Sequence, residues 1–246
     1  MAFAKKDNSG FEYKIVENVS GQSHKLILFK PKLISEENLI KKSEDISLIF
    51  GSAFYNKEGS FQEWPPERVL RRIREISFGI LVEKEGQKIG YAIFESPSCE
   101  LGNILFINSI GFAKQGAGLG QLIMREAINL EKSRIVAGRT QNPNLIKMLR
   151  RLNPVSILPI DEDYSSSEQN RQILDALRDK TVELRNAVID DNTGVCKKAY
   201  SKGKLGNYPV NLPDLETTKI QSRFNQIGLD QNGGDAVIVT AKLDFI

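Results

Sequence analysis

The stretch Gln115-Gly116-Ala117-Gly118-Leu119-Gly120 decides our prediction of the fold, because of what lies on either side of it. The four residues from Ile104 to Ile107 before it are all apolar, which is typical of a strand covered on both faces. The run after it carries apolar residues at helical spacing, namely Leu119, Leu122, Ile123, Ala127 and Leu130. A glycine-rich turn between strand and helix presents backbone N–H groups to an anion, which the helix dipole also favours. The stretch therefore predicts a phosphate-binding turn.

Two common nucleotide-binding patterns fail on a required residue. The phosphate-loop ATPase pattern needs a lysine directly after its second glycine, and with Gly111 and Gly116 as the glycines that place is held by Ala117. The dinucleotide pattern needs a third glycine three residues after the second. The two frames that the stretch allows put Gln121 or Ile123 there.

What remains is Gln-x-x-Gly-x-Gly in outline, here Gln-Gly-x-Gly-x-Gly, and it resembles motif A of the GNAT superfamily of acyl-CoA-dependent N-acyltransferases. The flanks match as well. Ile110 lies five positions before Gln115, where the family carries an apolar residue on the strand. Asn142, ahead of the helical run that follows Pro143, matches an asparagine that contacts the pantetheine arm in the family. The resemblance covers residues 75–160 well and the first 75 residues only loosely.

The resemblance implies that acetyl-CoA is the cofactor and that it is held mainly by backbone groups. The N–H groups of residues 116–120 would bind the pyrophosphate, and backbone groups of residues 110–112 would pair with the pantetheine arm like an added strand. The implied cofactor-binding residues are Ile110, Gly111, Phe112, Gln115, Gly116, Ala117, Gly118, Leu119, Gly120 and Asn142.

Acetyl transfer by direct attack requires the amine to lose a proton and the leaving thiolate to gain one. Many family members supply the acid from a tyrosine about seven residues after the asparagine, but here that place is held by Leu149, which cannot donate a proton. The tyrosines that remain as candidates by residue type are Tyr164, Tyr55, Tyr91 and Tyr200.

The sequence also leaves open which residue is the catalytic base. Glu95 and Glu100 flank the loop that enters the central strand, where some members place a catalytic glutamate. Each is also explained as a solvated carboxylate at a strand end. Some members use water to remove the proton, so catalysis does not require either residue.

Composition sets the broad class. The chain has 246 residues, 40% hydrophobic and 26% charged, which is typical of a globular protein, and its net charge of +3 gives no broad case for nucleic-acid binding. Two cysteines and one histidine exclude a disulfide framework and most His-based metal sites, so we expect no metal. We find neither a secretory signal nor an apolar run of the roughly 18 residues that span a bilayer, and we expect a cytoplasmic protein without membrane contact.

The order of the expected elements predicts an α/β fold with a mixed, mostly antiparallel sheet flanked by helices, which is also the order of the GNAT family. We expect residues 1–160 to form an acyl-CoA-binding core and residues 161–246 a C-terminal extension packed on it. Glu85-Gly86-Gln87 predicts a hairpin turn, and the apolar run from Ala236 to Leu243 predicts a strand that returns to the core sheet. The other expected strands are 26–29, 78–82, 89–94, 134–140 and 155–158. Helices are expected to begin near Ser35, near Pro65, at Pro143 and within Ser165–Glu168.

The C-terminal extension is patterned less clearly. A patchy helical stripe runs through Ile173, Leu174, Leu177, Leu184 and Val188. The sequence from Asp190 to Gly194 is expected to end that helix. The stretch that follows, with two glycines and two prolines between residues 203 and 213, predicts a loop.

The leading functional hypothesis is an N-acetyltransferase that moves an acetyl group from acetyl-CoA to a primary amine. The acceptor stays open among polyamines, amino acids, aminoglycoside-like antibiotics, protein amines and aminoacyl-tRNA. One alternative is a non-catalytic module that binds acyl-CoA as a sensor or structural element. Another is a toxin-like enzyme acting on aminoacyl-tRNA, for which a basic helix containing Arg68, Arg71, Arg72 and Arg74 would supply the RNA contact.

Overall fold

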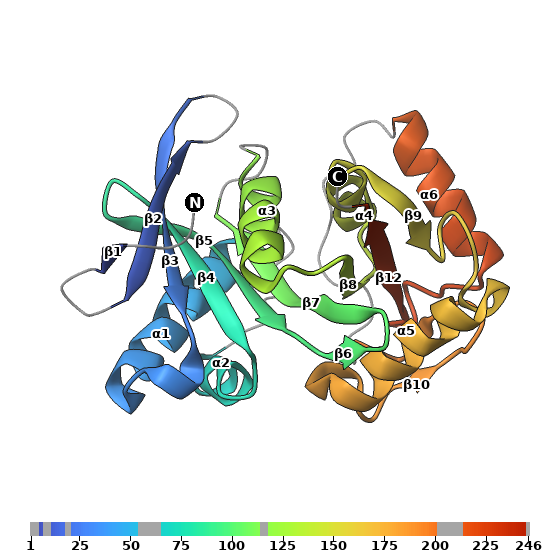
Figure 1. Cartoon of the computed structure of the whole chain (residues 1–246), viewed down its shortest axis with the longest axis horizontal. Helices are drawn as coiled ribbons and strands as arrows, with labels where there is room; N and C mark the ends of the chain where they lie inside the picture. The colour runs from blue at the N-terminus through green and yellow to red at the C-terminus, as the bar shows by residue number, and fades with distance from the viewer. Residues whose placement is uncertain are drawn as a thin grey trace. The chain divides into compact units, whose positions relative to one another are not determined.

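The computed structural model describes residues 5–6, 11–17, 21–53, 65–113, 118–200 and 214–244, and it consists of two compact units. Unit 1 comprises Met1–Glu95 and Ile107–Leu130, and unit 2 comprises Ser96–Phe106 and Glu131–Ile246. Strand β7 (Gly102–Phe112) gives its first half to unit 2 and its second half to unit 1 (Figure 1).

Unit 1 is a sheet with helices. Its strands follow the order β1-β2-β3-β4-β5-β7, and the pairings from β1 through β5 are all antiparallel. The elements besides β7 are β1 (Lys5–Lys6), β2 (Glu12–Glu17), β3 (Ser23–Phe29), η1 (Pro31–Leu33), α1 (Glu36–Ala53), α2 (Pro66–Ile73), β4 (Phe78–Lys84), β5 (Gln87–Glu95) and α3 (Leu119–Glu131).

The hairpin of β4 and β5 confirms the predicted turn. Phe78 pairs with Phe94 and Lys84 with Gln87, which leaves Glu85 and Gly86 as the two central residues. Both have positive φ, 52° and 80°, as the tight turn of a right-twisted hairpin requires. Glycine adopts this conformation at no steric cost, which explains the residue at the second position.

Helices cover both faces of the unit 1 sheet. Tyr13 of β2 lies opposite Ile27 of β3 and packs on the core cluster formed with α1 and α2. The next residue, Lys14, must point to the other face because side chains alternate along a strand. Its Nζ binds Glu126 of α3 at 2.7 Å, so α3 covers that second face.

Unit 2 is built around β12 (Ala236–Leu243). This strand pairs antiparallel with β8 from Val237 opposite Thr140 to Lys242 opposite Ile135, and it also pairs with β9 and β11. The predicted return of this strand to the sheet is therefore confirmed. The other elements are β6 (Ser98–Cys99), β8 (Ile135–Thr140), α4 (Pro143–Arg150), β9 (Pro154–Leu158), η2 (Tyr164–Ser166), α5 (Glu168–Lys180), η3 (Val182–Leu184), β10 (Val188–Ile189), β11 (Val195–Lys197) and α6 (Leu215–Gln226).

The expected fold class, a mixed α/β fold with a largely antiparallel sheet flanked by helices, is confirmed. The compact units do not divide the chain at residue 160. Ile173 and Leu177 of α5 share one buried cluster with Phe106 of β7 and Ala137 of β8, so residues on either side of 160 build the same core. The assignment of residues 1–160 as an acyl-CoA-binding core stays a prediction.

One expectation for the C-terminal extension was wrong, and one helix was missed. The helical stripe does not continue to Val188, because α5 ends at Lys180 with Thr181 in extended backbone; Leu184 is buried from a 3-10 turn and Val188 lies in β10. Helix α6 was not predicted. The buried residues of this helix are Ile220 and Phe224.

None of the helices in the described part of the chain has the length and apolar character that a bilayer span needs.

Candidate functional site

The turn between β7 and α3 leads into a helix that begins where the sequence predicted. Residues 114–117, with Gln115, Gly116 and Ala117 among them, lie outside the described residues. Gly118 has a φ of +70°, and its carbonyl oxygen accepts from the Leu122 N–H at 3.1 Å, so the helix starts at Leu119. The first turn of α3 contains no acidic residue. Its N–H groups lack intrahelical partners, as at any helix start, and no carboxylate of that turn competes for them.

Three of the predicted cofactor-binding residues, Ile110, Gly111 and Phe112, are the last residues of β7, just before this turn. Ile110 and Phe112 are half-buried and Gly111 is buried. The Ala113 N–H donates to the Ile89 carbonyl of β5 at 2.9 Å. A Cβ at Gly90 would lie 2.5 Å from the Phe112 ring, so glycine is needed for the ring to lie against β5. The contact of these residues with a cofactor stays a prediction.

Asn142, in unit 2, is the N-cap of α4. Its backbone is extended, its side-chain oxygen accepts from the Asn144 N–H at 2.9 Å, and Pro143 occupies the first helical position. The Asn142 N–H in turn donates to Thr140 Oγ1 at 2.8 Å. The cap uses only the side-chain oxygen of Asn142, and its amide Nδ2 takes no part in it.

Leu149 of α4 is fully buried, as is Ile146 on the preceding turn. The residue that stands in the usual tyrosine position is therefore part of the hydrophobic core. A tyrosine there would have to place its hydroxyl in an apolar environment or displace the helix.

Glu95 belongs to a buried polar chain inside unit 1. It is the last residue of β5, is 4% exposed, and accepts from Asn108 Nδ2 at 2.7 Å. Asn108, on β7, also accepts from Nε of Arg72 on α2. A single amide therefore links a guanidinium to a buried carboxylate. Sequence reasoning named Glu95 but not Asn108, and it considered Arg72 only as part of a basic helix that could contact RNA.

A second polar pair lies on the same two strands. The Tyr91 hydroxyl of β5 is 2.8 Å from Ser109 Oγ of β7. Tyr91 is fully buried, and this burial raises its pKa, although Ser109 and the charge of Arg72 act in the opposite direction. Arg72 is therefore linked by hydrogen bonds to Glu95 through Asn108, and its positive charge also works to lower the pKa of Tyr91.

Glu100 lies in unit 2 and is exposed. Cys99 pairs with Gly102, so Glu100 and Leu101 are the two central residues of the hairpin between β6 and β7. This placement favours the solvated carboxylate that was its alternative explanation.

Tyr164 is inside the core of unit 2. It is fully buried, its hydroxyl lies 2.7 Å from Thr240 Oγ1, and it donates to the Ile238 carbonyl at 3.3 Å. Burial raises its pKa, which makes deprotonation harder. A hydroxyl used in this way inside the core has a structural role, so we do not carry Tyr164 forward as the acid.

The other candidate tyrosines are not gathered at one site among the described residues. Tyr55 lies outside the described residues, so its candidacy stays a prediction, and Tyr91 is enclosed as described above. Tyr200 is half-buried, and its ring lies 5.3 Å from the guanidinium carbon of Arg139. Among the described residues, no group of three or more His, Cys, Asp or Glu side chains could hold a metal ion.

Comparison with known proteins gave structural neighbours only, since no protein-family model and no curated protein matches the chain. The GNAT domain of S. lividans PAT is 12% identical, with a TM-score of 0.42, over 56% of this chain and 85% of its own. The ribosomal-protein-S18-alanine N-acetyltransferase from Escherichia coli is 11% identical, with a TM-score of 0.43, over 90% of this chain and 96% of its own.

A third neighbour, a GNAT family acetyltransferase from Brucella melitensis in complex with acetyl-CoA, is 16% identical, with a TM-score of 0.37, over 53% of this chain and 83% of its own. Two of these three structures are acetyltransferases, and the other is a GNAT domain. Likenesses at TM-scores below 0.5 fix neither its fold nor its activity by themselves. The functional argument rests on its own residues.

Proposed function

We propose that the chain is an acetyl-CoA-dependent N-acetyltransferase of the GNAT type that acts on a primary amine. The observation that carries the proposal is the junction between β7 and α3. There Gly118 of the glycine-rich motif has left-handed φ, and the last two residues of the motif begin a helix without acidic residues in its first turn. Such a junction offers N–H groups and a helix dipole to a pyrophosphate.

The cofactor would use two sets of groups in unit 1. The turn and the start of α3 bind its pyrophosphate, and backbone groups of residues 110–112 bind its pantetheine arm. The contact of Asn142, in unit 2, with a cofactor stays a separate prediction.

Glu95 is the candidate base. The amine nitrogen attacks the thioester carbonyl carbon, the C–S bond breaks, and the proton of the amine passes to the Glu95 carboxylate, directly or through a water. Asn108 and Arg72 support this role because they hold the carboxylate in place within the fold, where it can accept the proton that the neutral amine loses on attack. We assign no side chain to the thiolate, which takes its proton from water.

A second candidate function is binding of acyl-CoA without turnover. The observation that favours it is the burial of Leu149 and Tyr164. Leu149 stands where the family often has its acid tyrosine and has no hydroxyl. The hydroxyl of Tyr164, the first candidate to replace that tyrosine, is enclosed in the core. The RNA-directed alternative is weakened by the structure, because Arg72 binds Asn108 and Arg74 pairs with Glu36.

Thermal melting with acetyl-CoA, coenzyme A, ATP and NAD in separate samples tests the cofactor class. A ligand at about a hundred times its Kd adds about 2.7 kcal/mol of stability, so a specific ligand raises Tm clearly. A shift with acetyl-CoA and coenzyme A alone supports the proposal, and its absence would contradict it. Release of free thiol in the presence of a panel of amines then separates an enzyme from a binding module.

A further inference from the structure

We propose that helices α1 and α2 of unit 1 form a self-complementary surface through which two copies of the chain associate as a weak, two-fold symmetric dimer. We call this surface the α1–α2 face. It lies entirely in unit 1 and consists of the exposed side chains of Leu33, Glu37, Ile40, Glu44, Leu48, Arg68 and Arg71. The association does not depend on acetyl transfer, because α3 and the turn before it belong to the other face of the same sheet.

The two helices lie side by side on one face of the unit 1 sheet (Figure 1). Leu39 and Ile46 of α1 are buried in the same core cluster as Val69 and Ile73 of α2, and this cluster includes Ile27 of β3. Because both helices bury one side against the sheet, their exposed sides point the same way, away from it. Together these sides form one outer layer.

The exposed side of α1 combines acidic and apolar side chains. One stripe runs along the helix, at spacings of three and four residues, through Glu37, Ile40, Glu44 and Leu48. Ile40 is 41% exposed and Leu48 is 74% exposed. Leu33, at the end of η1 just before the helix, is 77% exposed. Single exposed apolar residues are ordinary, but their grouping with an acidic stripe indicates a contact surface.

The exposed side of α2 carries the opposite charge. Arg68 and Arg71 are three residues apart and both exposed, so they are neighbours on that side of the helix. Lys41 on α1 and Glu67 on α2 have the reverse sign, yet α1 as a whole is net negative and α2 is net positive. The layer is therefore divided into an acidic and a basic half.

This division makes the face complementary to a second copy of itself. A two-fold axis that runs between the helices, perpendicular to their layer, places α1 of each copy on α2 of the other. The same attraction already acts within the chain, where Arg74, directly after α2, pairs with Glu36 at the start of α1. A polyanion such as RNA fits this face poorly, because the acidic stripe beside the arginines repels it.

The expected association is weak because the face is small. Helix α1 has 18 residues and α2 has 8, so they are about 27 Å and 12 Å long. With a width of about 10 Å for each helix, the layer offers on the order of 400 Å² per copy, against about 800 Å² per partner in a standard interface. Exposed charge pairs add little. We therefore expect dimerisation at micromolar or higher concentrations, and weaker dimerisation in salt.

Sedimentation equilibrium of the full chain, over protein concentrations up to the high micromolar range, tests the proposal. Two charge-reversal variants are compared with the wild type. Glu37→Arg, Glu44→Arg makes both helices basic, and Arg68→Glu, Arg71→Glu makes both acidic. We expect each variant alone to associate at least about tenfold more weakly than the wild type, because like charges then face each other.

The decisive sample is an equimolar mixture of the two variants. The basic α1 of the first variant then meets the acidic α2 of the second, and the basic α2 of the first meets the acidic α1 of the second. The mixture should therefore dimerise about as tightly as the wild type, and so should a chain that carries all four changes. Leu48→Asn, at an exposed position, should weaken dimerisation while leaving Tm unchanged.

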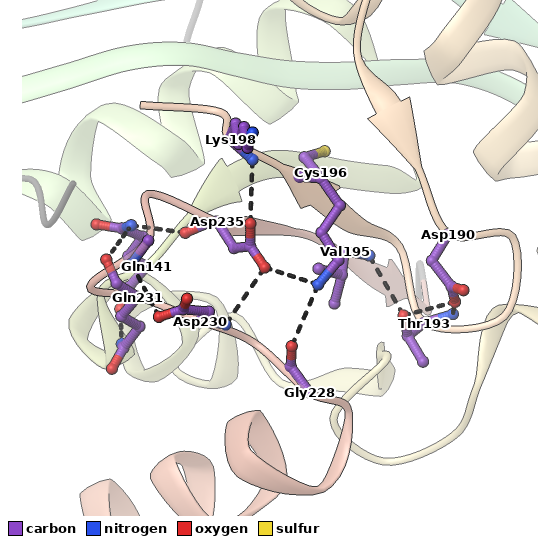
Figure 2. Close-up of polar contacts among 12 residues, drawn as sticks. Gln141, Asp190, Thr193, Val195, Cys196, Lys198, Gly228, Asp230, Gln231 and Asp235 are labelled. Carbon is purple, nitrogen blue, oxygen red and sulfur yellow. Dashed lines mark hydrogen bonds and ion pairs between the residues drawn. The ribbon is translucent and has the colours of Figure 1, made fainter. Parts of the chain in front are cut away.

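Two control variants change unit 2 instead. Glu168→Arg, Asp175→Arg alters exposed residues of α5 and matches the charge change of the first variant. Asp235→Asn lowers stability, because the Asp235 carboxylate accepts from the Lys198 N–H at 3.0 Å and from the Asp230 N–H at 3.3 Å, as Figure 2 shows. Both controls should dimerise like the wild type.

Four results would overturn the proposal: a wild-type chain that stays monomeric, wild-type assemblies larger than a dimer, charge-reversal variants that associate like the wild type, or equal weakening in the α5 control. A mixture that dimerises no better than its two folded components would overturn it as well. None of these results bears on acetyl-CoA binding, so the proposed function is tested separately.

Discussion

Asn108 donates its amide Nδ2 to the Glu95 carboxylate at 2.7 Å, across the strands β5 and β7. The oxygen of the same amide accepts from Arg72, so Asn108 satisfies a cation and an anion at once. Removing it would leave two polar groups in a largely enclosed place without this partner, which makes the residue informative for both stability and activity.

Glu95→Gln should abolish most of the acetyl transfer without weakening cofactor binding. The amide cannot accept the proton of the amine, and general-base catalysis contributes about 10²- to 10⁴-fold. The measurements are kcat, from the rate of thiol release, and the Kd for acetyl-CoA. An unchanged kcat would remove Glu95 from the mechanism and leave water as the base.

Asn108→Leu should cost about 1–3 kcal/mol of stability, because Glu95 loses a donor and Arg72 an acceptor. Chemical denaturation measures this cost. The double variant Glu95→Leu, Asn108→Leu should be less destabilised than the sum of the two single changes, since each single change removes the same bond. Strict additivity would show that the two residues do not interact in solution.

Tyr164→Phe separates a structural role from a catalytic one. The variant keeps the ring and loses the bonds to Thr240 and Ile238, so we expect a loss of about 1–2 kcal/mol and an unchanged kcat at temperatures well below Tm. A large fall in kcat with little change in Tm would restore the tyrosine as an acid.

The Lys242–Glu162 pair predicts a dependence of stability on pH. The hydrogen bond from Lys242 is the largest of several contacts that together lower the pKa of Glu162 from 4.5 to about 2, against the opposing effect of burial. A lowered pKa means that the stabilisation is present above 4.5 and is lost as the pH falls toward 2. Lys242→Met should therefore lower Tm at neutral pH. Its Tm should also fall less steeply than that of the wild type as the pH drops from 4.5 toward 2. A parallel decline in both proteins would show that the pair does not contribute.

The sequence predicted best where local chemistry dominates. The Glu85-Gly86 turn, the start of α3 after Gly118 and the start of α4 at Pro143 each depend on residues close together in the chain. Helix α6 was missed because its buried side consists of two residues, Ile220 and Phe224, and its cap is a single Asp214.

The polar chain around Glu95 could not be predicted because it depends on register. Arg72, Asn108 and Glu95 come from a helix and two strands, and only the pairing of β5 with β7 brings the last two together. The burial of Tyr164 is similarly non-local, since the hydroxyl is satisfied by β12, more than 70 residues later in the chain.

Gly120→Ala gives a sharp test of the turn, because stability and affinity should move in opposite directions. Gly120 is the second residue of α3, where alanine favours the helix by about 0.5–1 kcal/mol. The added methyl group should nevertheless obstruct the phosphate and weaken acetyl-CoA binding. Gly118→Ala should weaken binding too, but with a loss of stability, because its φ of +70° disfavours alanine. Unchanged affinity in both variants would contradict the assignment of this turn.

The most direct test of the account compares acetyl-CoA with S-acetylpantetheine, which carries the same thioester without the pyrophosphate, by calorimetric titration of the wild-type chain. If the turn before α3 binds the pyrophosphate, acetyl-CoA should bind about 10- to 100-fold more tightly, the contribution of charge-assisted hydrogen bonds, and Gly120→Ala should narrow the difference. Equal affinities for the two compounds, or no binding of acetyl-CoA, would contradict it.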